Sequence, residues 1–255
     1  MENSRGGNLK KSTQNYHIIA LRSFLKYLAK RDIPCLAPEK IELSNVPQRQ
    51  VEFLEGKDLE RLLAAPNVVL TETLNHHRPN VEQELLASRD SAILELFFST
   101  GLRISELCNL QKEDINLAND EFTIRGKGEK LRVVFLSDRA KQKLRSYLSK
   151  RQDLSPYLFV SLDRASLARD ETPLTPRSVQ RLIRRYSRVA GITKHVTPHT
   201  LRHSFATDLL RSGANIREVQ QMLGHASITT TQVYTHVTDA ALRDVHKKFH
   251  GGSLK

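Results

Sequence analysis

The stretch TPHTLRHSFATDLL, residues 197–210, constrains the fold most, because it has the apolar spacing of a helix but carries charge on its apolar side. Thr197 suits an N-cap and Pro198 the first helical position. The apolar positions that follow share one broad arc: Leu201, Phe205, Ala206, Leu209 and Leu210. His199 and Arg202 fall within this arc, so the fold must accommodate them away from bulk water.

A buried guanidinium is strongly unfavourable without an anionic partner. Arg202 must therefore either form a structural salt bridge or face a cleft in which an anion binds, which the N-terminus of a helix favours. His199 and His203 have the i, i+4 spacing of a metal pair. No Glu follows His199 and no third ligand is evident, so we expect no metal site.

The balance of charge indicates a polyanionic partner, although a basic protein without one would have the same composition. The 255 residues include 40 Lys and Arg against 28 Asp and Glu, a net charge of +12. Residues 177–190, RSVQRLIRRYSRVA, would form a helix with one apolar face, and the opposite face has no acidic residue. That basic face consists of Arg177, Arg181, Arg184 and Arg188. A solvated helix face usually mixes both signs, so we expect these arginines to bind DNA.

The chain is predicted to be mainly helical, with one β-hairpin over residues 121–137, EFTIRGKGEKLRVVFLS. Helical spacing covers 12–30, and the proline-containing residues 31–50 indicate a linker. Residues 67–88 are polar and are expected to be irregular. The other predicted helices are 56–65, 88–101, 137–151, 176–190, 198–211, 216–223, 228–237 and 240–248. No membrane span, secretory signal or disulfide spacing is visible, so we expect a cytoplasmic protein.

Further polar residues stand where predicted elements end. Arg103 follows a glycine C-cap in TGLRISEL, and Lys127 lies between two glycines at the hairpin tip. His225 follows a helix ended by Gly224, and Tyr234 lies on a short helix in SITTTQVYTHV. Taken singly, each has an ordinary explanation: a solvated turn lysine, a histidine C-cap or a core tyrosine with a satisfied hydroxyl.

Taken together, the motifs TGLRISEL, RGKGEK, PHTLRHSFATDLL and MLGHASITTTQVYTHV resemble those of the tyrosine recombinases, or phage integrases, and residues 196–237 are most similar to the Xer site-specific recombinases. The residues that carry the resemblance are Arg103, Lys127, His199, Arg202, His225 and Tyr234. The resemblance implies a mainly α catalytic domain with a small antiparallel three-stranded sheet over residues 47–255, ending in a tail helix. It implies that residues 1–46 are a short, truncated piece of a helical, SAM-like core-binding domain plus a linker.

The resemblance also implies a mechanism. Tyr234 would attack a DNA phosphodiester and form a 3′-phosphotyrosyl link, with His199 as the base and Lys127 as the acid for the leaving 5′ oxygen. The two arginines of the set and His225 would stabilise the phosphoryl oxygens. No cofactor is expected. The bond energy stays in the covalent intermediate, so ATP is not required, and the cationic side chains take the place of Mg²⁺.

Partners follow from the same resemblance: double-stranded DNA, a homo- or hetero-tetramer on two DNA sites, and a DNA translocase. The segment DAALRDVHKKFHGG would dock in a neighbouring subunit or pack on its own domain. The role would be resolution of chromosome or plasmid dimers, linked to chromosome partition at cell division. Alternatives are the integrase of a mobile element, a type IB topoisomerase, and a non-catalytic helix-turn-helix protein, which would leave Arg103, Lys127 and Arg202 without a role.

Overall fold

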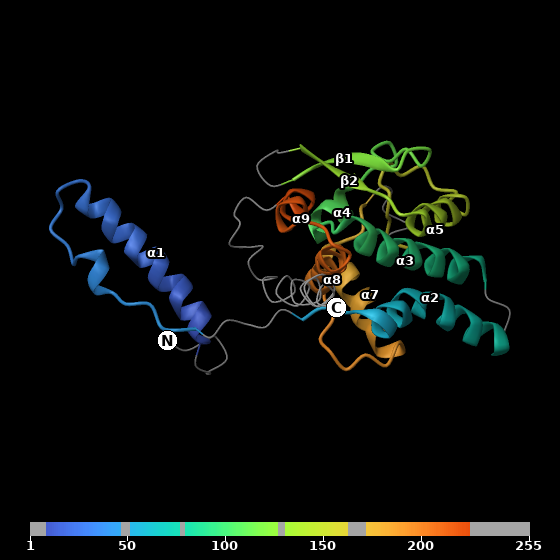
Figure 1. Cartoon of the computed structure of the whole chain (residues 1–255), viewed down its shortest axis with the longest axis horizontal. Helices are drawn as coiled ribbons and strands as arrows, with labels where there is room; N and C mark the ends of the chain where they lie inside the picture. The colour runs from blue at the N-terminus through green and yellow to red at the C-terminus, as the bar shows by residue number, and fades with distance from the viewer. Residues whose placement is uncertain (1–8, 47–51, 77–79, 127–130, 163–171, 225–255) are drawn as a thin grey trace, which may run out of the picture. The chain divides into compact units, whose positions relative to one another are not determined.

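The structure is a computed structural model that describes residues 9–46, 52–76, 80–126, 131–162 and 172–224 (Figure 1). The chain divides into two compact units, residues 1–50 and 51–255. Among the described residues, no helix is both long and apolar enough to cross a membrane.

The N-terminal unit contains one long helix, α1 (Lys11–Ala29), and a 3₁₀ turn, η1 (Pro38–Lys40). Asn15 ties the helix to the following segment, because its side chain donates to Ser44 O (2.7 Å) and accepts from Ser44 N (2.9 Å). No residue of α1 is buried, and Phe24 and Tyr27 are among its exposed apolar side chains. The prediction of a helix followed by an irregular segment is confirmed.

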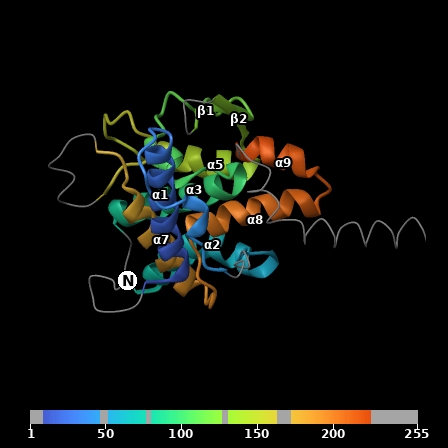
Figure 2. The same ribbon diagram turned by 90° about the vertical axis from the view of Figure 1, so that its left-hand side faces the viewer.

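The second unit is built around α3 (Val81–Thr100), whose residues 89–97 are all buried. Helices α2 (Gly56–His76) and α5 (Asp138–Leu148) both pack against α3, and Figure 1 shows it between them. The remaining helices are α4 (Ile104–Asn109), α7 (Pro176–Val189), α8 (Pro198–Arg211) and α9 (Ile216–Leu223). Helix α8 contacts α3 and α9, and lies beside α9 in both views (Figures 1 and 2).

The expectation that residues 67–88 are irregular is wrong for most of them. Helix α2 continues to His76 with Pro66 inside it, and α3 begins at Val81. Asn80 caps α3 in a capping box, accepting from Gln83 N (2.8 Å) while its own N–H donates to the Gln83 side chain (3.1 Å). The polar residues lie mainly on exposed faces, which hid the helical spacing.

The predicted hairpin is confirmed. Strands β1 (Glu121–Arg125) and β2 (Leu131–Phe135) are antiparallel, with Phe122 opposite Val134 and Ile124 opposite Arg132. Phe122, Ile124 and Val134 are buried on the inner face. The described residues form a sheet of two strands, so the third strand implied by the family resemblance stays a prediction.

Candidate active site

Helix α8 begins as the sequence predicts. Thr197 Oγ1 accepts from Thr200 N (3.1 Å), and Pro198 occupies the first turn. Arg202 is buried, but His199 is exposed, so the prediction that both lie on the buried arc is wrong for His199. Three residues of winding place the two side chains about 60° apart, which is enough to bring His199 to the edge of the arc.

Arg202 is only 4% exposed, and main-chain carbonyls hold its guanidinium. Nη1 donates to Gly101 O, and Nη2 donates to Leu223 O. Gly101 is the C-cap of α3 and Leu223 is the last residue of α9, so Arg202 lies at the negative ends of two helices. Sequence patterns indicated a salt bridge or an anion cleft, and did not indicate this carbonyl arrangement.

Gly101 allows α8 to approach this closely. Its φ is 59°, in the left-handed region that favours glycine. A Cβ at this position would lie 2.5 Å from Phe205 Cδ1 and 3.1 Å from Leu223 Cδ2. The glycine is therefore required by the backbone conformation and by the contact with α8.

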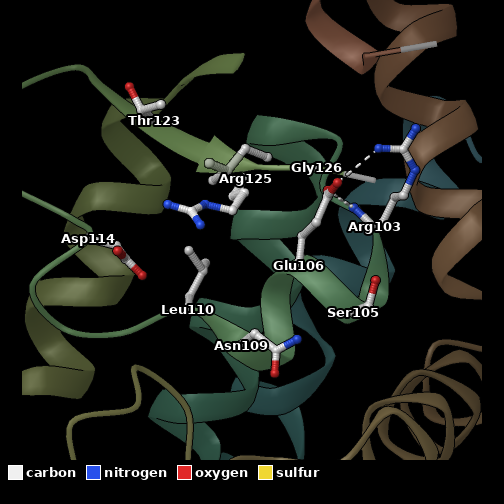
Figure 3. Close-up of a pocket in the computed structure, with 10 residues that line it drawn as sticks. Arg103, Ser105, Glu106, Asn109, Leu110, Asp114, Thr123, Arg125 and Gly126 are labelled. Carbon is white, nitrogen blue, oxygen red and sulfur yellow. Dashed lines mark hydrogen bonds and ion pairs between the residues drawn. The ribbon is translucent and has the colours of Figure 1, made fainter. Parts of the chain in front are cut away.

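Arg103 stands at the start of α4, with its side chain 30% exposed. Its Nη1 donates to Glu106 Oε1 (2.8 Å), and its main-chain N–H donates to Glu106 Oε2 (2.7 Å). Its Nη2 donates to Gly224 O (3.0 Å). Figure 3 shows the guanidinium of Arg103 next to the Glu106 carboxylate.

Sequence analysis missed Glu106 and its second partner, Arg132. Both Nη atoms of Arg132 bind Glu106, at 2.8 Å to Oε1 and 2.7 Å to Oε2. Burial alone would raise the pKa of Glu106, but the hydrogen bonds and charge of Arg132 and Arg103 outweigh it and lower that pKa to about 2. One sequence signal could have indicated the contact between Arg103 and Glu106: Glu106 follows Arg103 by three residues, the spacing of a capping box.

A cavity of about 500 Å³ lies between α4 and the hairpin. Arg103 and Glu106 line one side of it, and Thr123, Arg125 and Gly126 line another (Figure 3). Gly126 is the residue directly before Lys127, so the last described residue of this side of the hairpin lines the same cavity as Arg103.

His203 lies one turn after His199 and is partly buried. Burial, together with the charges of His199 and Arg202, lowers the pKa of His203 to about 4. Its imidazole is therefore neutral at physiological pH.

Three of the six predicted site residues, Lys127, His225 and Tyr234, lie outside the described residues. Of the three that are described, Arg103, His199 and Arg202, the structure brings the two arginines together. Arg202 donates to Leu223 O, and Arg103 donates to the next carbonyl, Gly224 O. These carbonyls immediately precede His225.

Helix α7 has the predicted two faces. Val179, Leu182, Ile183 and Tyr186 are buried. The opposite face is exposed and carries Arg177, Arg181, Arg184 and Arg188. Within the parts of the chain that the structure describes, none of these four arginines forms an ion pair.

Comparison with known proteins identifies the family. The model of the phage integrase family matches residues 52–241. The tyrosine recombinase XerC of Thermodesulfovibrio yellowstonii is 38% identical over 250 residues, covering 94% of this chain and 76% of the relative.

The similar solved structures include two Xer recombinases. A crystal structure of a XerA recombinase is 34% identical, with a TM-score of 0.62 over 94% of this chain and 77% of the other. A XerH site-specific recombinase, bound to its difH substrate in a pre-cleavage complex, is 26% identical, with a TM-score of 0.68 over 94% of this chain and 66% of the other.

The chain therefore belongs to the phage integrase family, whose members are the tyrosine recombinases. It is an Xer-like site-specific recombinase, an enzyme that cuts and rejoins DNA, and that prediction is confirmed.

Proposed function

We propose that Tyr234 cuts one DNA strand by forming a 3′-phosphotyrosyl link, within a site that Arg103 and Arg202 help to build. The observation that carries this proposal is the convergence of both guanidiniums on the Leu223 and Gly224 carbonyls, next to His225. Two cations held at the end of α9 provide positive charge where a phosphate gains negative charge in the transition state.

The other roles follow the family resemblance. The exposed position of His199, in the first turn of α8, leaves its imidazole accessible as a base for the tyrosine proton. Lys127 would protonate the departing 5′ oxygen, and its neighbour Gly126 lines the cavity beside Arg103. His225 would donate a hydrogen bond to the phosphate.

Double-stranded DNA is the proposed partner, supported by the similar XerH structure with its substrate and by the exposed arginine face of α7. The proposed assembly is a homo- or hetero-tetramer that binds two DNA sites. The C-terminal segment of each chain would dock in a neighbouring subunit, and a DNA translocase would be a further partner. The proposed role is resolution of chromosome or plasmid dimers in the cytoplasm, and integration of a mobile element is the alternative.

The domain assignment is part of the same proposal. Residues 47–255 would be the catalytic domain, which includes the range matched by the family model. Residues 1–46 would be a piece of the core-binding domain, with α1 as its helix and a linker after it.

A nicked suicide duplex carrying a candidate site tests the chemistry. The chain is expected to form a covalent adduct that a denaturing gel separates from free DNA, and Tyr234→Phe should abolish it. Tyr157→Phe removes a phenol hydroxyl elsewhere and should leave the adduct intact. An adduct that persists in Tyr234→Phe would contradict the assignment of the nucleophile.

A further inference from the structure

The carboxylate of Glu106 poses an electrostatic problem for the site. It is 6% exposed and is bound to both the main chain and the side chain of Arg103. A carboxylate and a guanidinium in contact have no net charge together. If Glu106 had Arg103 as its sole cation, Arg103 would bring little net charge to a phosphate.

Arg132 changes this balance. It lies on β2, opposite Ile124, with its side chain 9% exposed on the inner face of the hairpin. Its two Nη atoms bind the two oxygens of Glu106 separately, which is the fork geometry of a strong arginine–carboxylate pair. The three groups together have a net charge of about +1, because one carboxylate is paired with two guanidinium groups.

Arg132 also contacts the end of α9. A Cβ placed on Gly224 would lie 3.0 Å from Arg132 Cδ and 3.3 Å from its Nη1. The glycine, with φ 62°, therefore leaves room for the stem of this arginine. Arg132 thus contacts both the carboxylate that orients Arg103 and the residue whose carbonyl Arg103 binds.

We propose that Arg132 is a positioning residue of the cleavage reaction. It neutralises Glu106, so that the carboxylate orients Arg103 while Arg103 keeps its charge for the phosphate. This inference rests on the proposed function, in which Arg103 binds the scissile phosphate. A purely structural Arg132 would affect folding but would not control the charge available to Arg103.

A rescue experiment separates these roles. Arg132→Met leaves Arg103 as the partner of Glu106, and we expect single-turnover adduct formation at saturating protein to slow by about 100-fold. Adding Glu106→Gln removes the uncompensated carboxylate. The double variant should therefore form the adduct at least about tenfold faster than Arg132→Met. Arg132→Lys keeps the charge without the fork, so its rate should be intermediate.

The control is Arg139→Met, which removes an arginine paired with another buried carboxylate, that of Glu95 (2.9 Å). It should lower the midpoint of urea unfolding but leave the rate of adduct formation unchanged. DNA affinity, measured by fluorescence anisotropy, should be the same for the Arg132 variants and the wild type, because Arg132 is buried.

The outcomes are distinct. A double variant as slow as Arg132→Met, or an Arg132→Met variant at the wild-type rate, would overturn the positioning role and leave the proposed function intact. If Arg132→Met does not fold, Arg132→Gln removes the same charge but keeps a hydrogen-bond donor, and a wild-type rate in that variant would overturn the role equally. A wild-type chain that forms no adduct, although it binds the duplex, would refute the proposed function and this inference with it.

Discussion

Helices α8 and α4 each have an arginine near the N-terminus, and the two are held in different ways. In α8, Arg202 is buried and its guanidinium donates to two main-chain carbonyls, at Gly101 and Leu223. In α4, Arg103 is partly exposed and is oriented by a carboxylate that a second arginine shares. The carbonyls carry only partial charges, whereas the carboxylate carries a full one that needs a counter-ion.

The positions of the two arginines therefore depend on different properties of the fold. The position of Arg202 depends on how α3, α8 and α9 pack, so errors in packing should disturb it. The position of Arg103 depends on ionised groups, so changes in charge or pH should disturb it.

Arg202→Lys is expected to have the largest effect. A lysine keeps the charge but cannot reach two carbonyls with one planar fork, so adduct formation should fall by about 10²- to 10³-fold. The midpoint of urea unfolding should also fall, because buried carbonyls lose their donors. Arg103→Lys, at a partly exposed site, should lose rate but keep that midpoint. Equal unfolding midpoints for both variants would contradict the comparison.

Gly101→Ala tests the packing of the α8 site. The left-handed φ and the contact with Phe205 should together lower the free energy of unfolding by about 2–4 kcal/mol. Gly56→Ala is the matched control, because Gly56 has φ +50° and nothing within 4 Å of its added Cβ. It should lose about 1 kcal/mol. Urea unfolding measures both, and similar losses would show that the contact with Phe205 costs little.

The two regions should respond to acid in different pH ranges. The pKa of His203, on α8, is lowered from 6.5 to about 4, so the unfolded chain takes up its proton first and stability falls as the pH drops between these values. The pKa of Glu106 is lowered from 4.5 to about 2, so its contribution to stability is present above pH 4.5 and is lost as the pH falls toward 2.

Urea unfolding of His203→Gln and Glu106→Gln across pH 2–7 measures these contributions. The difference between wild type and His203→Gln should vary mainly between pH 6.5 and 4, and that for Glu106→Gln between pH 4.5 and 2. A difference that does not vary with pH would mean that the group concerned has its ordinary pKa in the folded chain.

The smallest effect is expected for the exposed arginines of α7, which form no ion pair within the described residues. Arg184→Ala should reduce the slope of log K against log salt by about 0.9, because one phosphate contact releases about one counter-ion. The control is Arg145→Ala, which removes an arginine of α5 whose guanidinium donates to Leu117 O. It should leave the slope unchanged. An unchanged slope in Arg184→Ala would exclude this residue from the DNA interface.

Local patterns predicted much of this molecule. Apolar spacing and caps predicted α7, α8 and α9, and the Gly-Lys-Gly turn predicted the hairpin. The family motifs indicated Arg103 and Arg202. Glu106 and Arg132 could not be paired in this way, because their contact joins a helix to a strand 26 residues later and depends on which face of β2 is inward. The exposure of His199 likewise depends on how α8 packs.

The carbonyl contacts of Arg202 have a consequence for the growing polypeptide. Residues before 200 can already bury most of the main core, in which α2, α3 and α5 take part. The guanidinium that joins Gly101 to Leu223 cannot make both bonds until the ribosome has released α9. A chain interrupted before α9 can therefore hold most of the main core but lacks the contact of Arg202 with Leu223 O.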